Sequence, residues 1–253
     1  MNNVVAIIQA RMGSSRLPGK VMKDIGGKPV LQHVIERTRL AKAVNAVAVA
    51  TTSDPGDDAI VTFCETLAVP VFRGSVQDVL DRYYRAALKF RADIVARITA
   101  DCPLIDGGLI DQTVNEFEQH GVDFAANRLP PPFKRTFPIG LDVEVASFKA
   151  LERAWKEATE KYEREHVMPY LYEKEGRFKV FVLNNAVDYG SLRWTLDTAE
   201  DLELVRVVFA RFAPRTDFAW KEVLALFQRE PELAAINSGV VHKTYLDVDE
   251  RNR

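Results

Sequence analysis

VVAIIQARMGSSRLPGK, residues 4–20, is the stretch that decides the fold. Its first five residues form a continuous apolar run, which is typical of a strand buried on both faces of a parallel sheet. A polar loop follows from Gln9 to about Gly27, and Pro29 is suited to the first turn of a helix. A buried strand, a loop containing glycines and a helix in this order predict the first unit of a parallel α/β sheet.

The alternation of strand and helix continues to about residue 120. Apolar runs predict strands at 46–51, 69–72 and 93–99, and amphipathic segments predict helices at 57–68, 76–91 and 110–120. This order predicts a doubly wound, mostly parallel, Rossmann-like sheet. Such sheets bind ligands beyond the carboxyl ends of their strands, where the 9–27 loop and Asp101 are expected to lie.

The pattern changes after about residue 122. A proline-rich turn occupies 129–132, and the segments 141–145 and 178–183 alternate like antiparallel strands. Further along the chain we predict a strand at 192–196 and helices at 148–159, 199–212 and 220–228. No linker or internal repeat divides the chain, so residues 1–253 are expected to form a single domain.

Composition excludes several functional classes. The net charge of −2 gives no bulk indication of a nucleic acid or membrane partner. Residues 1–50, however, hold eight Lys or Arg against two acids, a local excess of six charges that suits an anionic ligand. Cys64 and Cys102 form no disulfide framework, the four histidines have no zinc spacing, and no apolar run approaches a membrane span. We therefore expect a cytoplasmic protein.

The loop after the first strand combines glycines with cations. It is not a Walker A loop, because five residues separate Gly13 from Gly19 and no Ser or Thr follows Lys20. Gly13 and Ser14 can still offer donors to phosphate, and Arg11, Arg16 and Lys20 lie within ten positions. The alternative is a solvated basic surface loop.

The loop is also where a family resemblance begins. ARMGSSRLPGK (10–20) and DIGGKPVLQHVIER (24–37) resemble the cytidylyltransferases that activate sialic acid and Kdo, and above all their SpsF-like branch of spore coat polysaccharide biosynthesis. The resemblance continues through FRGSVQDVLDRYYRA (72–86), ITADCPLID (98–106), PIGLDVEV (138–145), YEREHVMPYLY (162–172) and RWTLDTAEDL (193–202). It implies a nucleotide-diphospho-sugar transferase fold with a small β-rich insertion at about 125–190, used for acceptor binding and dimerisation.

The resemblance also assigns nucleotide contacts. It implies that the loop holds the triphosphate of CTP and that Arg82 lies near the base or ribose. The nucleotide-binding residues are then Arg11, Gly13, Ser14, Arg16, Lys20 and Arg82. A homodimer is expected, since two-fold pairs are the commonest oligomers.

Two acids are candidates for Mg²⁺. Asp101 follows a buried strand and Asp197 precedes a predicted helix, and the resemblance implies metal ligands at both positions. The alternatives are a turn residue at 101 and a helix cap at 197. In the resulting reaction an acceptor oxygen attacks the α-phosphorus of CTP and pyrophosphate leaves. Lys20, Arg16 and Asp101 would then be catalytic, through charge neutralisation and positioning.

The acceptor site is predicted further along the chain. Asp142 and Glu144 alternate onto one face of a strand and could bind sugar hydroxyls, or could be the wet face of an edge strand. Arg135 could meet an acceptor carboxylate. His166, in an aromatic setting, is either part of the acceptor pocket or a structural histidine. The predicted acceptor is a small acidic sugar or similar molecule.

Three other functions remain open at this point. A sugar-1-phosphate nucleotidyltransferase would use another nucleotide, but its usual GxGTRLxP loop is missing. A glycosyltransferase would use a nucleotide sugar, and the only Asp-x-Asp motif, at 247–249, lies in the charged C-terminal tail. A non-enzymatic nucleotide-binding or scaffold protein would have no need of both Asp101 and Asp197.

Overall fold

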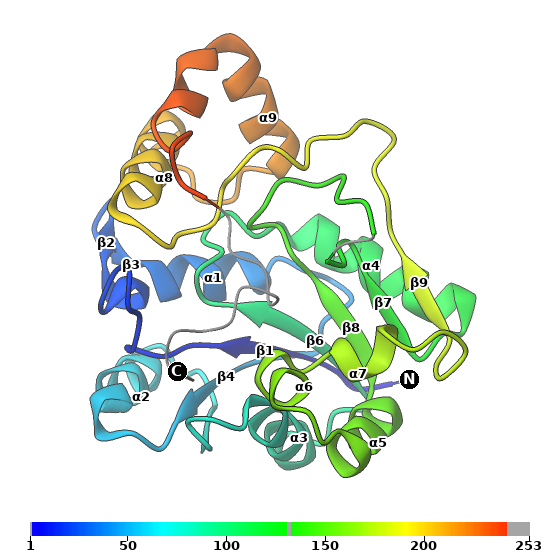
Figure 1. Ribbon diagram of the computed structural model, residues 1–253. Coiled ribbons are helices and arrows are strands. Elements are labelled where there is room, and N and C mark those ends of the chain that lie inside the picture. The colour runs from blue at the N-terminus through cyan, green and yellow to red at the C-terminus, as the bar shows by residue number, and fades with distance from the viewer. Residues whose placement is uncertain (1, 131–132, 242–253) are drawn as a thin grey trace.

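A seven-stranded sheet runs through the centre of the computed structural model, which describes residues 2–130 and 133–241 (Figure 1). The Asp-x-Asp motif at 247–249 and the prolines at 131–132 lie outside the described residues. In spatial order the strands are β5 (Val71–Gly74), β4 (Ala46–Thr52), β1 (Val4–Gln9), β6 (Ile94–Thr99), β8 (Glu144–Ser147), β7 (Phe124–Ala126) and β9 (Val180–Val182). A two-stranded ribbon, β2 (Asp24–Ile25) and β3 (Lys28–Pro29), stands apart.

Strand direction divides the sheet into two parts. β5, β4, β1 and β6 are parallel, whereas β8 is antiparallel to both of its neighbours and β7 and β9 are parallel to each other. The predicted doubly wound, mostly parallel, Rossmann-like sheet is therefore confirmed.

Helices cover both faces of the sheet. The α-helices are α1 (Val30–Thr38), α2 (Asp58–Thr66), α3 (Val79–Lys89), α4 (Gly107–His120), α5 (Phe148–Glu157), α6 (Lys161–His166), α7 (Pro169–Tyr172), α8 (Ala199–Phe212) and α9 (Trp220–Arg229). Short 3₁₀ turns, η1 (Lys20–Met22), η2 (Pro55–Asp57) and η3 (Pro231–Ala235), complete the described part. Figure 1 shows α1, α4, α8 and α9 above the sheet and α3, α5, α6 and α7 below it.

The continuous apolar run of β1 serves both faces. Ala6 and Ile8 pack into the core that includes α1, α4, α8 and α9, while Val5 and Ile7 pack into the core that includes α3, α5 and α7. Because side chains alternate along a strand, a strand buried on both faces needs apolar residues at every position.

Several predicted boundaries move because side chains cap helices at unexpected places. α3 begins at Val79 rather than 76, since the Asp78 carboxylate accepts a hydrogen bond from Asp81 N. α4 begins at Gly107, three residues early, because Asp106 caps it in the same way through Leu109 N. The strand predicted at 69–72 is shifted to 71–74. The short elements β7, α6 and α7 and the β2–β3 ribbon were not predicted from the sequence.

The prediction of a strand at 192–196 is wrong. This segment makes only an isolated bridge, between Ile139 and Arg193, and is otherwise irregular. Its backbone is instead held at separate points: Trp194 N donates to Ile139 O at 2.7 Å and Leu196 N donates to Asp101 O at 2.8 Å. The apolar side chains at 194 and 196 are buried in the core, which explains why apolar residues occupy alternate positions here although the segment is not a strand.

The segment at about 125–190 contributes to the main sheet. β8 lies between β6 and β7, and β9 extends the same sheet, while α5, α6 and α7 cover one face. Its role in dimerisation stays a prediction. No helix in residues 2–130 and 133–241 is both long and apolar enough to cross a membrane.

Candidate active site

The carboxyl ends of three neighbouring parallel strands create the site. β1, β4 and β6 lie side by side and end at Gln9, Thr52 and Thr99. The 10–20 loop therefore emerges next to the turn that carries Asp101, as expected for an α/β sheet. Asp57 follows β4 at the same edge.

The 10–20 loop is closed by specific contacts. Gly19 N donates to Met12 O at 3.0 Å, and Gly19 has a φ of +66°, a conformation that favours glycine. Met12 N donates to the Asp57 carboxylate at 2.7 Å, and the same buried carboxylate accepts from Thr51 and Thr52 at the end of β4. Asp57 was not among the predicted site residues, because an acid at the start of a predicted helix resembles an ordinary cap.

The predicted phosphate donors of the loop have different surroundings. A side chain added at Gly13 would meet open space, so the backbone there is approachable by a ligand. Ser14 Oγ accepts a hydrogen bond from Leu17 N at 3.3 Å and supports the turn. Arg11 is half-buried and makes no ion pair with any described residue. The loop thus offers backbone and cationic groups at the strand ends, as the phosphate-binding hypothesis requires.

Lys20 joins the loop to both predicted metal ligands. Its Nζ donates to Asp101 Oδ2 at 2.8 Å, to Asp197 Oδ1 at 2.8 Å and to Leu196 O at 3.0 Å. Burial disfavours the charged ammonium, but Asp101 and Asp197 outweigh burial and raise the pKa of Lys20 above its usual value. One cation position is therefore bounded by three oxygens from two distant parts of the chain.

Asp197 does not cap α8. Thr198 is the N-cap, its hydroxyl accepting from Asp201 N at 3.3 Å, so the cap alternative for Asp197 is excluded. Asp197 Oδ2 instead contacts Arg16 at 3.0 Å and Arg193 at 2.9 Å. Burial would raise the pKa of Asp197, but Lys20 and the arginines hold it far below its usual range, so the carboxylate is ionised.

These residues fit a magnesium ion that is shared with a substrate. Among the described residues, no group of three or more His, Cys, Asp or Glu side chains is placed to hold a metal. Magnesium, however, is usually held by one or two carboxylates together with phosphate oxygens and water. Asp101 and Asp197, converging on one cation position, supply a donor set of that kind.

Arg82 is buried with part of its guanidinium free. Its NH1 donates to Ser75 O at 2.7 Å, but Nε and NH2 have no partner within the described part of the chain. The residue is fully buried, which lowers its pKa, and Arg11 lies close enough to lower the pKa further. The structure thus places Arg82 beside the loop residue Arg11, and its contact with a base or ribose stays a prediction.

Asp142 and Glu144 lie among arginines rather than on a wet edge. Asp142 accepts from Arg128 Nε at 3.1 Å and from Arg135 NH2 at 3.1 Å, and Glu144 pairs with Arg97. The edge-strand alternative is wrong: the strand predicted at 141–145 is shifted to 144–147, so Asp142 precedes β8, and Glu144 begins a strand that has β6 on one side and β7 on the other. Arg135 and Arg128 overcome the effect of burial and hold the pKa of Asp142 far below its usual range.

Arg97 and Arg128 were not among the predicted site residues. An arginine within the apolar run at 93–99 was the available signal, since a charge in a buried strand needs a partner. Arg97 also donates to Gln9 Oε1 at 3.2 Å, which links this arginine cluster (Arg97, Arg128 and Arg135) to the end of β1.

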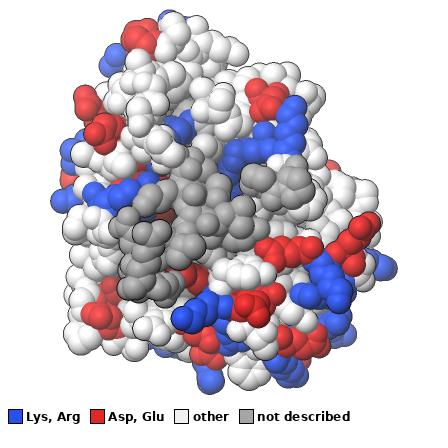
Figure 2. Space-filling model, viewed as in Figure 1, with Lys and Arg blue, Asp and Glu red and all other residues white. Residues whose placement is uncertain are grey.

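The arginine cluster lies near Asp101, one of the two predicted metal ligands. Burial raises the pKa of the Cys102 thiol well above its usual value, and the charges of both Asp101 and Asp142 raise it further. The thiol lies 3.7 Å from Asp101 Oδ1, stays protonated and is unsuited to act as a nucleophile. In Figure 2, basic side chains gather to the right of centre, where Figure 1 shows the loop that follows β7.

His166 belongs to a different element. It is the last residue of α6, and Arg164 of that helix pairs with Asp78, the N-cap of α3, at 2.5 Å. The structure thus anchors α6 to the start of α3, and the part that His166 plays in acceptor binding stays a prediction.

The sequence has relatives that share this architecture. It matches the cytidylyltransferase family model over residues 5–208. An uncharacterized protein of Methanocaldococcus jannaschii is 38% identical over 98% of this chain and 99% of that protein. The spore coat polysaccharide biosynthesis protein SpsF of Bacillus subtilis is 30% identical over 92% of this chain and 98% of that protein.

Two further similarities carry more specific names. The solved structure of a cytidylyltransferase from Leptospira borgpetersenii has a TM-score of 0.86 and 33% identity, covering 96% of this chain and all of that one. The 8-amino-3,8-dideoxy-manno-octulosonate cytidylyltransferase of Shewanella sediminis is 40% identical over 48% of this chain and 50% of that protein.

Proposed function

This chain belongs to the cytidylyltransferase family of nucleotidyltransferase enzymes, and from that premise we propose that it transfers CMP from CTP to an acidic sugar or related small acceptor. Pyrophosphate is the leaving group and Mg²⁺ is the cofactor. Biosynthesis of a surface polysaccharide or another glycoconjugate is the proposed setting, because the relative SpsF is a spore coat polysaccharide biosynthesis protein.

The observation that carries the proposal is the position of Lys20. Its ammonium has Asp101 Oδ2, Asp197 Oδ1 and Leu196 O within 3.0 Å, at the end of a loop that also carries Arg11 and Arg16. A cation position bounded by two carboxylates, next to cationic groups at a strand end, is what a metal-bound triphosphate requires.

Asp101 and Asp197 would hold the metal, which when bound would neutralise phosphate charge and polarise the reacting phosphoryl group. The side chains of the chain itself do the remaining work. Arg16 and Lys20 already lie against Asp197, so both are positioned to neutralise charge on the departing pyrophosphate. The acceptor oxygen attacks the α-phosphorus directly, so positioning of the two substrates replaces a covalent intermediate.

The arginine cluster supports an acidic acceptor. Within residues 2–130 and 133–241, Arg97, Arg128 and Arg135 form their ion pairs with two acids, Asp142 and Glu144, so three positive charges pair with two negative ones. A carboxylate on the acceptor would balance the remaining charge and can accept paired hydrogen bonds from a guanidinium. The name of the Shewanella relative, a cytidylyltransferase of an octulosonate, supports the same class of acceptor.

The test of substrate choice is a panel of reactions. Each of CTP, UTP, GTP and ATP is incubated with candidate sugar acids and with the 1-phosphates of uncharged sugars, and pyrophosphate release is measured. Release with CTP and a sugar acid is the expected result. Preference for UTP or GTP with a sugar phosphate would indicate a sugar-1-phosphate nucleotidyltransferase. In a separate reaction, turnover of a nucleotide sugar, with no activity on the triphosphates, would indicate a glycosyltransferase.

The metal ligands are tested by near-isosteric substitution. Asp101→Asn and Asp197→Asn each remove one negative charge from the ion's surroundings, where charge matters most. Because Thr198 caps α8, Asp197→Asn leaves the helix start intact. We expect turnover to fall much more than thermal stability does, and EDTA to abolish activity until Mg²⁺ is added back. Full activity in either variant would remove that residue from the metal site, and nucleotide binding without any turnover would favour the scaffold alternative.

A further inference from the structure

A buried arginine contacts the carboxylate oxygen of Asp197 that does not face Lys20. Arg193 is only 7% exposed, and its NH2 donates to Asp197 Oδ2 at 2.9 Å. The same guanidinium makes a forked contact with Asp201, from Nε to Oδ1 and from NH2 to Oδ2, both at 2.9 Å. The planar fork of arginine is therefore fixed by Asp201 while its outer edge reaches Asp197.

Asp201 is itself fixed on several sides. It is fully buried, and its Oδ2 accepts from Asp197 N at 2.9 Å and from Thr198 N at 3.1 Å. Asn237 Nδ2 donates to Asp201 Oδ1 at 2.8 Å and to Arg193 O at 3.0 Å. The start of α8 and the segment after η3 thus hold the arginine in one orientation.

The two oxygens of Asp197 have separate tasks. Oδ2 pairs with Arg193 and Arg16, while Oδ1 pairs with Lys20 Nζ. Oδ1 therefore faces the cation position that Asp101 also contacts. If Oδ2 lost Arg193, its remaining partner would be the more exposed Arg16, and the carboxylate could rotate more freely about its terminal bond, because that torsion is soft. The arrangement therefore selects which oxygen is offered to a cation.

We infer that Arg193 is a positioning residue of the cytidylyltransferase reaction, which orients Asp197 so that Oδ1 serves as a ligand of the metal–nucleotide complex. The inference rests on the proposed function, in which Asp197 holds Mg²⁺. Partners that orient a metal ligand commonly contribute ten- to a hundredfold to metal affinity or activity.

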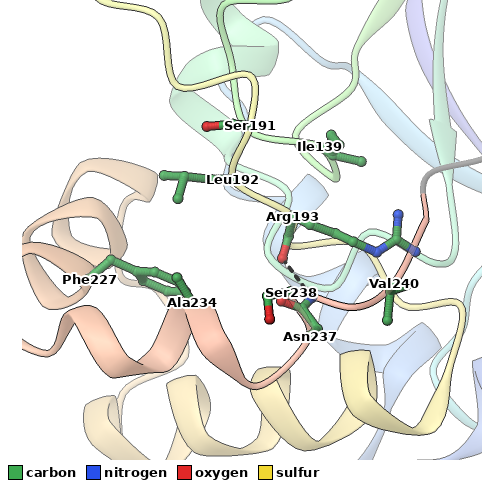
Figure 3. Close-up of a pocket in the computed structure, with 9 residues that line it drawn as sticks. All are labelled: Ile139, Ser191, Leu192, Arg193, Phe227, Ala234, Asn237, Ser238 and Val240. Atoms are coloured by element: carbon green, nitrogen blue, oxygen red, sulfur yellow. Dashed lines mark hydrogen bonds between the residues drawn. The ribbon is translucent and has the colours of Figure 1, made fainter.

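A cavity next to Arg193 makes the role testable by chemical rescue. The cavity has a volume of about 300 Å³ and its lining includes Arg193, Asn237, Ile139 and Phe227 (Figure 3). In Figure 3 the dashed line joins Asn237 to the backbone of Arg193 at this cavity. A guanidinium ion could enter from it and replace the side chain that Arg193→Ala removes.

A matched control is available elsewhere in the chain. Arg37 is 2% exposed and donates to the backbone carbonyls of Ile105, Thr216 and Phe218. It is a buried arginine of comparable structural importance, but its hydrogen bonds go to backbone oxygens and not to a carboxylate of the site. Arg37→Lys therefore measures what the loss of a buried guanidinium does to folding alone.

The experiment compares wild type, Arg193→Lys, Arg193→Ala and Arg37→Lys. Binding of Mn²⁺ is measured by calorimetry in the presence of a non-hydrolysable CTP analogue, together with Tm, kcat and KM. Arg193→Lys keeps the charge and most of the volume, so it provides a folded variant if the alanine variant does not fold.

We expect both Arg193 variants to bind Mn²⁺ ten- to a hundredfold more weakly and to lose kcat, with guanidinium at millimolar concentration restoring part of the Mn²⁺ affinity of Arg193→Ala. Arg37→Lys should lose Tm but keep Mn²⁺ affinity. Arg193 variants with Mn²⁺ affinity within twofold of wild type would overturn the positioning role while leaving the proposed function intact. A wild-type protein that binds no Mn²⁺ with the analogue would overturn both.

Discussion

Replacing Lys20 with methionine is expected to strengthen the binding of a divalent cation to the nucleotide-free protein. The ammonium occupies the position between Asp101 and Asp197, with 2.8 Å to each carboxylate. A metal that enters without nucleotide must therefore displace Lys20, whereas in the presence of a triphosphate the lysine has phosphate oxygens to which it can transfer. Methionine keeps much of the buried chain without the charge.

The size of the effect follows from the contacts that Lys20 makes. A hydrogen bond to a charged group contributes about 1.5–3 kcal/mol, and 1.4 kcal/mol corresponds to a tenfold change in affinity. At the lower end of this range, removing competition from one such bond should strengthen metal binding about tenfold, and removing both about a hundredfold. Arg16 and Arg193 still neutralise Asp197 in the variant, so we expect a value between these limits.

The assay is a Mn²⁺ titration without nucleotide, in which free Mn²⁺ is read by electron paramagnetic resonance. Lys28→Met is the control, because Lys28 pairs with Glu36 on α1 and not with either metal carboxylate. The same Lys20→Met protein should bind CTP more weakly than wild type, since a phosphate contact is lost. Equal Mn²⁺ affinity in wild type and Lys20→Met would refute competition between the lysine and the metal.

Three further predictions concern the loop, the arginine cluster and assembly. Arg16→Ala should weaken CTP binding roughly ten- to a hundredfold in calorimetry while the fold is retained. An unchanged affinity would favour the alternative that the loop is a solvated basic surface loop. Asp142→Asn should flatten the acid side of the stability curve: Arg135 and Arg128 keep the pKa of Asp142 far below its usual range, so its contribution is complete above about pH 4 and is lost as the pH falls further. Thermal unfolding between pH 7 and pH 3 checks this, and parallel curves for wild type and variant would contradict it. Light scattering at micromolar concentration should give the mass of a homodimer, and a monomer would count against a dimerisation role for residues at about 125–190.

The parallel part of the fold could be predicted because its signals are local. The run at 4–8 is apolar at every position, as a strand covered on both faces requires, and it is too short for a buried helix. The 192–196 segment could not be assigned in the same way. Trp194 and Leu196 are buried by contacts with distant elements, and apolar residues at alternate positions look the same in a strand and in a buried irregular segment.

The charged residues of the site likewise differ in how far they could be predicted from local sequence. Arg11, Arg16 and Lys20 are close in sequence, so their loop was visible as a cluster. Asp142 and Glu144 were also found, but their partners Arg97 and Arg128 were not, since those pairs form only when β6, β7 and β8 assemble into one sheet. Ion pairs between distant residues depend on tertiary contacts, which spacing along the chain does not report.

Asp197 shows how structure decides between two readings of one residue. Next to Thr198 and before α8, either residue satisfies the sequence rule for a helix cap. The structure gives the cap to Thr198 and the support beneath it to Asp201, so the carboxylate of Asp197 has no role in starting the helix. It forms ion pairs with three cations instead, Arg16, Lys20 and Arg193, and the first two belong to the loop that follows the first strand. Lys20 also pairs with Asp101 and Arg193 with Asp201, so Arg16 is the one of the three whose ion pairing, among the described residues, is with Asp197 alone. Under the proposed function, Arg16 is therefore the cation that can turn most easily to the phosphates of a bound triphosphate.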